Sequence, residues 1–442
     1  MSNTRNRGLE TICYIIAGEF ISVAIDRTMQ TFDVIVIGAG PAGATAAAAA
    51  AAAGLRVIIL EKYVLPRHKT CGGGMPMTVG SVLRDLVPEA FVEADVRYMR
   101  HTWKFQDPYL APINPPGAQP ELTLWMVQRS TFDNALTQRA VQIGAEVRDG
   151  ISVRSLERGR STVLVRAETR DGTNLEFSAP WVIGADGANG VTAREVGLRR
   201  RRSLAIGLEV EHPHQWGDGR PHLRPDVIHL EYGAVPRGYA WVFPKAHHLN
   251  VGAGLFRPRR PDGRGDRRVR EQLQDAICGY LEHFGLSYCR DDLAYYAHPL
   301  PIWNGRERLQ TDDNRILLAG DAAGLINPIF GDGILHAIKS GVIAAKCVAD
   351  GRPEEYTQRI HAELADNFDA AGSLAKLFYS MTGTIYKHGI KRPTATHAAT
   401  RLLCGDDLFL DAKGRAVRIL KEAIGSRMTS TERPTAQSDV SL

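Results

Sequence analysis

The sequence lacks paired cysteines. Six cysteines are scattered over 442 residues and no CxxC occurs, so neither a zinc site nor a disulfide framework is indicated. Such cysteine use fits a reducing, cytoplasmic setting. The histidine pairs His212 with His214 and His247 with His248 do not place two imidazoles on a helix face beside a carboxylate. We therefore expect no metal.

A strong charge imbalance and a membrane-spanning run are also absent. A net charge of +5 with 23% charged residues is not the footprint of a nucleic-acid-binding protein. The apolar stretch from Cys13 to Ile25 contains Glu19 and is too short to span a bilayer, and we interpret the residues before Met29 as a non-native start. The arginines at 199–202 predict a solvated loop that can attract a lipid phosphate, so peripheral membrane contact stays open.

A βαβ unit is present near the start of this chain, whose 44% hydrophobic content can fill a sizeable core. The apolar run from Phe32 to Ile37 predicts a buried parallel strand, residues 44–53 an alanine-rich helix and residues 55–60 a second buried strand. The first turn reads GxGxxG from Gly38 to Gly43, and Glu61 ends the second strand. This context predicts a dinucleotide site, with Glu61 on the ribose hydroxyls and NADP disfavoured.

Two further glycine-rich segments follow later strands in the chain. Asp186 and Gly187 lie in the segment 184–190, and Gly320 and Asp321 lie in the segment 319–324. Residues 328–333 then open a helix predicted over 332–350, whose N-terminal amides favour negative charge on a reduced flavin. This order resembles the glutathione-reductase-like and para-hydroxybenzoate-hydroxylase-like flavoproteins, which bind FAD.

The resemblance implies a set of FAD contacts. Asp321 would hold the ribityl hydroxyls, and Arg129 would approach a phosphate or a flavin carbonyl; Arg129 as a solvated helix start and Asp186 as a turn cap remain alternatives. The predicted cofactor residues are Gly38, Gly40, Pro41, Ala42, Gly43, Glu61, Lys62, Cys71, Gly72, Arg129, Asp186, Gly187, Gly320, Asp321, Pro328, Gly331, Asp332, Gly333 and Ile334.

Two motifs point to a substrate. The strand-like segment 238–245 is similar to the YxWxFPK signature of geranylgeranyl reductases, and residues 69–76 resemble their Cys-Gly-Gly segment. Alternation puts Tyr239, Trp241 and Phe243 on one face, as an aromatic wall for an apolar chain or as ordinary core packing. Pro244 completes the predicted substrate pocket, and Lys245 is interpreted as a solvated strand end. The stretch 327–333 resembles the general bacterial and archaeal form, with Asp332 where glutamate is common, and differs from the chlorophyll-pathway form. This difference puts a chlorophyll-type substrate in doubt.

The resemblance to the geranylgeranyl reductase family implies an FAD-dependent oxidoreductase that reduces C=C bonds of a prenylated lipid, quinone or pigment precursor. NAD(P)H or reduced ferredoxin would be the electron donor, so an electron-donor protein is a candidate partner. Catalytic candidates are Cys71, Tyr239 and Trp241, and the first two are candidates for the required acid. Rival interpretations are a flavin monooxygenase or halogenase, although the halogenase pattern WxWxIP is absent, and a flavin-binding redox sensor.

The predicted fold class is α/β, with a Rossmann-like FAD domain, an inserted antiparallel sheet for the substrate and a helical C-terminal region. Residues 66–120 predict loops and short helices, 128–143 a helix, 145–183 a β-meander, 204–256 strands and 315–319 a buried strand. The predicted units are the FAD domain in three parts (30–110, 111–200 and 306–350), the substrate sheet (201–305), the helical region (351–425) and a disordered tail (426–442).

Overall fold

The computed structural model describes residues 10–16, 19–25, 29–198, 203–217, 219–256 and 265–414. The predictions for the arginine run at 199–202 and for the tail at 426–442 lie outside these residues. Before Met29, strands β1 (Glu10–Ile16) and β2 (Glu19–Ile25) pair as an antiparallel hairpin. No helix in the described part is long and apolar enough to cross a bilayer.

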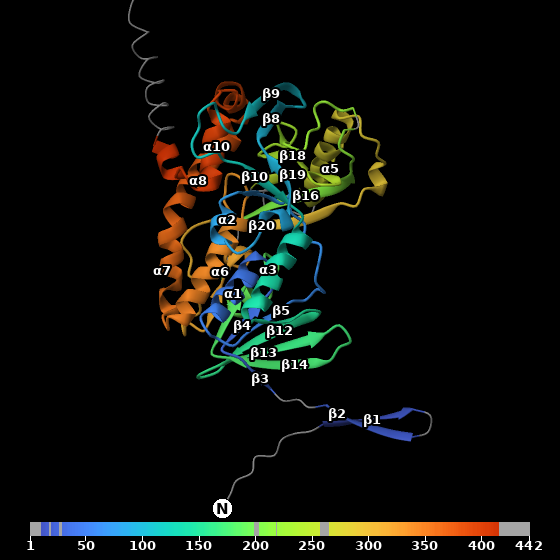
Figure 1. Ribbon diagram of the computed structural model, residues 1–442, viewed down its shortest axis with the longest axis vertical. Helices are drawn as coiled ribbons and strands as arrows, with labels where there is room; N and C mark the ends of the chain where they lie inside the picture. Colours follow the sequence, from blue (N-terminus) through green and yellow to red (C-terminus); the bar gives the residue numbers. More distant parts are fainter. Residues whose placement is uncertain are drawn as a thin grey trace, which may run out of the picture.

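A five-stranded parallel sheet forms the centre of the lower half of the molecule (Figure 1). All its strands except the edge strand β11 are largely buried and apolar, because helices cover one face and a second sheet covers the other. In spatial order they are β11 (Glu146–Arg148), β5 (Val57–Leu60), β4 (Val34–Ile37), β15 (Trp181–Gly184) and β21 (Ile316–Leu318).

Three helices cover one face of this sheet: α1 (Pro41–Ala52), α3 (Arg129–Ile143) and α6 (Ile334–Ala349). Helix α1 is almost entirely alanine, and its small side chains let both α3 and α6 pack against it. The approach to α6 is close, since a Cβ added at Gly341 would lie 2.1 Å from the carbonyl oxygen of Ala42. The other face is covered by the meander β12 (Ile151–Arg158), β13 (Val163–Thr169) and β14 (Asn174–Ala179), beside which lies β3 (Gln30–Thr31).

A seven-stranded mixed sheet fills the upper half, and α5 (Gly265–His283) covers one of its faces (Figure 1). All its neighbouring strands are antiparallel except β17 and β8. In order they are β20 (Tyr296–Ile302), β16 (Ser203–Pro213), β19 (His248–Phe256), β18 (Gly238–Pro244), β17 (Val227–Tyr232), β8 (Tyr98–Trp103) and β9 (Gln106–Pro112).

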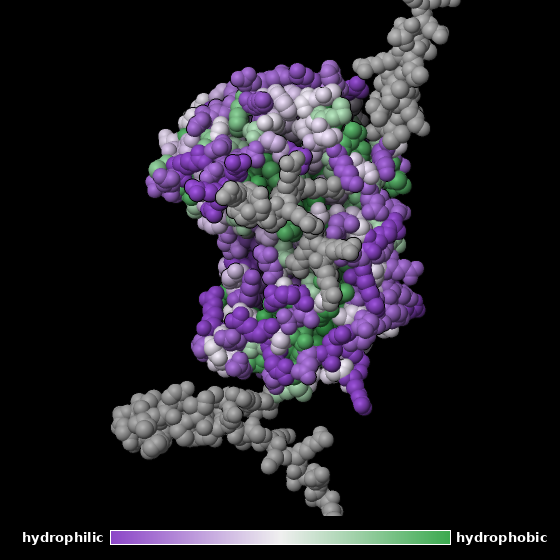
Figure 2. All heavy atoms as spheres, turned by 180° about the vertical axis from the view of Figure 1, so that it is seen from behind, coloured by the Kyte–Doolittle hydropathy of each residue, from purple (hydrophilic) through white to green (hydrophobic). Residues whose placement is uncertain are grey.

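A three-stranded sheet and the C-terminal helices complete the fold. The small sheet has the order β6 (Gly74–Pro76), β10 (Leu124–Val127), β7 (Val92–Val96), and short helices α2 (Val79–Val82) and α4 (Thr192–Glu195) lie in connections. Helices α7 (Tyr356–Ile360), α8 (Asp366–Ser380), α9 (Thr382–Ile385) and α10 (Ala395–Cys404) follow; α7, α8 and α10 run along one side of both halves (Figure 1). From behind, the surface is mostly hydrophilic, and its outline narrows on one side between the halves (Figure 2).

The structure confirms the βαβ unit, the helix at 128–143, the β-meander and, as far as residue 414, the helical C-terminal region, whose residues 415–425 lie outside the described part. The prediction of loops and short helices for 66–120 holds for residues 66–91, apart from β6, but it was wrong for residues 92–112, which form β7, β8 and β9. The physical reason is that β8 is stabilised by its pairing with β17, more than a hundred residues later in the chain. Local periodicity does not record such a partner.

Candidate active site

The three glycine-rich segments meet at one edge of the parallel sheet. GxGxxG follows β4, Asp186 lies just beyond β15, and Gly320 lies just beyond β21. Backbone hydrogen bonds join the segments, from Ala185 N to Ile37 O at 2.8 Å and from Ala319 N to Gly184 O at 2.9 Å. Ligands of open parallel sheets bind outside the carboxyl ends of the strands, so the predicted motifs share one such site.

The GxGxxG turn admits no side chains at two of its glycines. Gly38 has a φ of +99°, and a Cβ at Gly43 would lie 1.8 Å from the carbonyl oxygen of Gly38. At Gly40 the nearest atom would be an Arg67 guanidinium nitrogen at 3.8 Å, which leaves the backbone open. The carboxylate of Glu61 accepts a hydrogen bond from Ala39 N at 2.8 Å and so ties the turn to the end of β5. An open turn at the N-terminus of α1 suits a phosphate group.

Arg129 lies at the centre of a buried ionic cluster. Its guanidinium, only 8% exposed, donates two hydrogen bonds to Asp133 at 2.8 and 2.9 Å, and Arg67 lies 3.1 Å from the same carboxylate. Burial opposes the charge of Arg129, but Asp133 outweighs it and raises the Arg129 pKa above its ordinary value. Cys71, which lines the same cavity, also raises the Arg129 pKa. The alternative of a solvated helix start is therefore wrong.

Three aspartates face the same cavity. Burial opposes ionisation of Asp321, but the imidazole of His298, 3.5 Å from its Oδ2, and the charge of Lys69 lower its pKa. Asp186 caps a turn, because its Oδ2 accepts hydrogen bonds from the backbone and side chain of Thr192. Among the described residues, the buried Oδ1 atoms of Asp186 and Asp332 have no hydrogen-bond partner. A ligand with hydroxyl or N–H donors would satisfy them.

A cavity of about 960 Å³ runs past these groups and on to the large sheet. The open turn at Gly40, the unpartnered aspartate oxygens and the buried arginine together fit the phosphates and polar edges of FAD. All the predicted site residues line this cavity except Gly43, Pro328 and Pro244. Gly43 packs against the turn instead, and Pro244 falls on the opposite face of β18 because side chains alternate along a strand.

The aromatic strand and the Cys-Gly-Gly segment form one packed unit. Tyr239, Trp241 and Phe243 line the cavity in a row, with ring centroids 5.9 and 6.0 Å apart. A Cβ at Gly72 would lie 2.9 Å from two ring atoms of Phe243 and 3.2 Å from the indole nitrogen of Trp241. Gly73 has a φ of +67°, and its Cβ would lie 2.1 Å from the carbonyl oxygen of Val127. Only glycines let this loop lie flat against the aromatic wall.

Two buried ionisable groups flank the loop. Lys245 is 1% exposed, so its interpretation as a solvated strand end was wrong. Its ammonium donates hydrogen bonds to the carbonyl oxygens of Gly72 and Val127, and burial lowers its pKa to about 8. Glu209 is 2% exposed, burial raises its pKa to about 7, and it accepts a hydrogen bond from Cys71 N at 2.7 Å.

The sequence analysis did not identify several residues of the site. Arg67 and Lys69 lie in the predicted loop before Cys71, and their nearness to the Cys-Gly-Gly segment was the available signal. Glu209 and His298 gave no local signal, because they stand on β16 and β20 and reach the site only through the register of the large sheet, which pairs Glu209 with Tyr296 and Gly207 with His298.

The cavity becomes apolar beyond the aromatic wall. β8, β10 and β17 contribute aliphatic side chains, and residues of α8 and α10 cover the space from the other side. At this end His101 hydrogen-bonds the hydroxyls of Tyr232 and Thr396 at 3.3 and 3.0 Å. Burial lowers the pKa of His101 to about 4, so its ring is neutral at pH 7. The aliphatic lining residues are Met99, Leu124, Met126, Ile228, Leu230 and Leu403.

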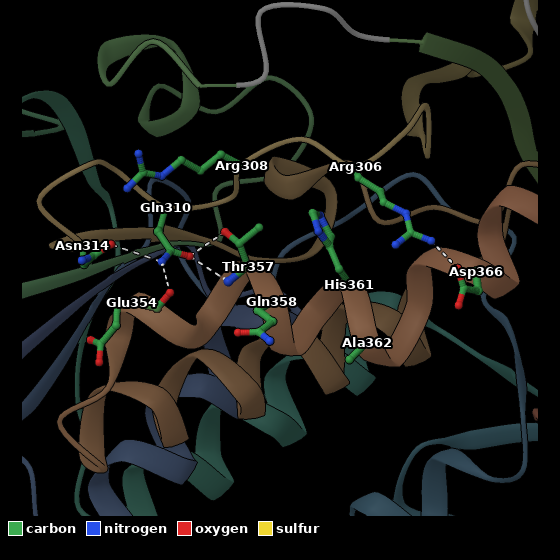
Figure 3. A pocket seen from close by; sticks show the side chains of 10 residues that line it. All are labelled: Arg306, Arg308, Gln310, Asn314, Glu354, Thr357, Gln358, His361, Ala362 and Asp366. Atoms are coloured by element: carbon green, nitrogen blue, oxygen red, sulfur yellow. Dashed lines mark hydrogen bonds and ion pairs between the residues drawn. The ribbon is translucent and has the colours of Figure 1, made fainter.

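A second hollow, of about 660 Å³, lies beside α7 (Figure 3). Its polar groups are used by one another: the amide nitrogen of Gln310 donates to Asn314 and to the carbonyl oxygen of Glu354, and its amide oxygen accepts two hydrogen bonds from Thr357. Arg306 is paired with Asp366. This hollow therefore joins α7 to the segment before β21 and offers few free groups to a ligand.

Comparisons with known proteins agree with this geometry. A family model described as an FAD binding domain matches residues 31–350. The digeranylgeranylglycerophospholipid reductase 1 of Methanopyrus kandleri is 30% identical over 370 residues, which cover 78% of this chain and 90% of that protein.

Two solved structures share the fold. A geranylgeranyl bacteriochlorophyll reductase-like protein from Thermoplasma acidophilum has a TM-score of 0.69 at 21% identity and covers 88% of this chain and 96% of its own. A flavin-dependent brominase has a TM-score of 0.67 at 18% identity, with coverages of 89% and 100%. The fold alone does not separate reductases from halogenases, but the match of sequence over most of both chains does set the family. The chain therefore belongs to the geranylgeranyl reductase family of FAD-dependent oxidoreductases.

Proposed function

We propose that this protein reduces C=C bonds in the prenyl chain of a lipid, quinone or pigment precursor. The observation that carries the proposal is the continuity of one cavity from the predicted FAD contacts, past the aromatic wall, to an apolar end. In this proposal the parallel sheet and its helices hold the cofactor, and the large sheet holds the substrate. An apolar chain gains free energy from the aliphatic and aromatic lining, at roughly 25 cal/mol per Å² removed from water.

The predicted cofactor contacts divide between two ends of FAD. The open GxGxxG turn, with Glu61 and Arg67 nearby, would hold the adenosine and phosphate part, and Asp321 would hold the ribityl hydroxyls. Asp332 and the residues before α6 would face the flavin ring. When bound, FAD supplies hydride chemistry, with NAD(P)H or reduced ferredoxin as the source of electrons.

The chain's own residues would orient the alkene and exclude water. Trp241 and Phe243, against which the glycine loop packs, give the cavity an apolar border along which a prenyl unit can lie. Because an isolated alkene is a poor hydride acceptor, a proton must reach the neighbouring carbon as hydride arrives. The protein therefore needs an acid at this wall.

Of the two candidate acids, the structure favours Cys71. The hydroxyl of Tyr239 already donates a 2.6 Å hydrogen bond to the carbonyl oxygen of Phe330, and burial raises its pKa above the ordinary value. The thiol of Cys71 lines the cavity and accepts a hydrogen bond from Gly73 N at 3.4 Å, which leaves its S–H free to point at a substrate. We propose that Cys71 holds the proton and that Tyr239 positions the turn at Phe330.

The test is anaerobic re-oxidation of the chemically reduced flavoprotein by geranylgeranyl diphosphate, a polyprenyl glycerolipid or a polyprenyl quinone. The proposal expects the flavin absorbance to return, with product heavier by the mass of two hydrogen atoms for each bond reduced. A second arm adds oxygen and halide. Products that gain oxygen or halogen, with no hydrogenated product in the anaerobic arm, would establish a monooxygenase or halogenase. Re-oxidation by none of these compounds would favour a redox sensor.

A further inference from the structure

The Cys-Gly-Gly loop begins where the ladder between β6 and β10 stops. The last ladder pair joins Met126 to Gly74, and Val127 N then donates to the carbonyl oxygen of Gly73 at 2.9 Å. Beyond this bond the two chains diverge, which would leave the carbonyl oxygens of Gly72 and Val127 without partners in a buried place. The ammonium of Lys245 lies between them, at 2.8 Å from the first and 2.7 Å from the second. Lys245 therefore replaces the missing ladder bonds.

Glu209 holds the next residue of the loop. Its carboxylate accepts the 2.7 Å hydrogen bond from Cys71 N, and its strand β16 pairs with β19, which carries Asn250. The Oδ1 atom of Asn250 in turn accepts a 2.8 Å hydrogen bond from the indole nitrogen of Trp241. Glu209 thus ties the backbone of Cys71 to the same sheet that carries the aromatic wall.

We propose that Lys245 and Glu209 are positioning residues that fix the Cys71 loop against the aromatic wall. Lys245, which directly follows β18, ties the loop to the end of β10 through the carbonyl oxygens of Gly72 and Val127. Glu209, on β16, holds the loop at Cys71 N. The consequence for turnover rests on the proposed function, because the loop carries the group assigned as the acid. A displacement of about 1 Å at such a loop can lower a rate by about a hundredfold.

This arrangement has a free-energy cost that favours a functional explanation. Both groups are almost fully buried, and burial shifts the pKa of each toward its neutral form. An apolar pair of the same volume would avoid the desolvation, but it could not bind a carbonyl pair and an amide at fixed positions. Burial of Lys245 and Glu209 thus lowers the free energy of unfolding, and in return the loop is held in one position.

The test measures the reactivity of Cys71 in the FAD-containing protein. Iodoacetamide labelling, resolved by peptide mass spectrometry, reports Cys71, and the exposed Cys289 is the internal reference. The variants are Lys245→Met, Glu209→Leu and Glu209→Gln; the last keeps a carbonyl acceptor for Cys71 N. Lys339→Met is the matched control, because Lys339 makes a 2.7 Å pair with Glu363 at the exposed side of α6.

We expect labelling of Cys71 to rise about tenfold in Lys245→Met and Glu209→Leu, with Cys289 unchanged. With a prenyl substrate, kcat should fall about tenfold to a hundredfold while KM changes less than about threefold, since positioning acts on the transition state. Glu209→Gln should restore most of what Glu209→Leu loses, and Lys339→Met should stay within about twofold of the parent in both assays.

Unchanged labelling and kcat in a folded, FAD-containing Lys245→Met would overturn the proposal, as would a Glu209→Gln variant as impaired as Glu209→Leu. If Lys245→Met does not fold, the two Glu209 variants decide by the same measurements. If the parent protein reduces no prenyl compound, the proposed function fails, but the labelling of Cys71 still tests whether Lys245 and Glu209 fix the loop.

Discussion

The packing of Gly72 against Phe243 gives a quantitative prediction. In a Gly72→Ala variant the new methyl carbon would lie 2.9 Å from two ring atoms of Phe243, which no ordinary contact allows. The ring or the loop must move, and overpacking of this kind costs about 1–3 kcal/mol of unfolding free energy. In the full-length enzyme the displaced ring would also narrow the cavity, so prenyl reduction should fall about tenfold.

A double-mutant cycle tests the assigned cause. Phe243→Leu removes the ring atoms that the methyl group meets, so the double variant should recover about 1–2 kcal/mol relative to the sum of the single variants. Urea unfolding of the FAD-free proteins measures the cycle. Gly414→Ala is the matched control, because a Cβ there meets nothing within 4 Å. A Gly72→Ala variant with parental stability, or a coupling energy near zero, would refute the packing of the loop on Phe243.

Three further predictions follow from ionisable groups of the site. The pKa of Glu209 is raised from 4.5 to about 7, so its contribution to the free energy of unfolding is present below pH 4.5 and is lost as the pH rises to 7. Relative to Glu209→Gln, the parent should lose up to about 3 kcal/mol of unfolding free energy over that range, as measured by urea titration at each pH. Parallel pH profiles for the two proteins would contradict this. Asp133→Ala leaves Arg129 buried without its carboxylate, so unfolding free energy should fall by about 3–5 kcal/mol, and a loss below about 1 kcal/mol in the same assay would count against the ion pair. In single-turnover re-oxidation, Cys71→Ala should slow the reaction about a hundredfold and Tyr239→Phe about tenfold or less; the reverse order would assign the acid to Tyr239.

The cofactor half of the site could be predicted from the sequence because its signals are local. Each glycine-rich segment directly follows a buried parallel strand, and the carboxyl ends of parallel strands meet at one edge of a sheet. Three segments spread over nearly three hundred residues of sequence were therefore expected to meet at that edge. The prediction needed only the strand that precedes each motif and not the register of any distant pair.

The substrate half could be predicted only in part, because its geometry depends on distant partners. Residues 98–112 show no regular alternation of polar and apolar side chains and contain two prolines, and β8 finds its partner β17 only far along the chain. Lys245 stands after a proline and before two histidines, a context typical of an exposed turn. Its burial is decided by the carbonyl oxygens of Gly72 and Val127, whose positions no local pattern records.

The aromatic signature and the Cys-Gly-Gly segment looked in the sequence like two independent indications of a prenyl substrate. In the structure they are one unit: Phe243 and Trp241 forbid side chains at Gly72, and Lys245, which ends the aromatic signature, binds the loop backbone. Their joint presence is therefore one indication of a prenyl substrate and not two, but the packing explains why the two motifs occur together. In a chain that kept the aromatic residues but lost the glycines, the loop could not pack against the aromatic rings. The two motifs together thus predict an apolar surface that can bind a prenyl chain. The FAD contacts alone would fit a halogenase equally well.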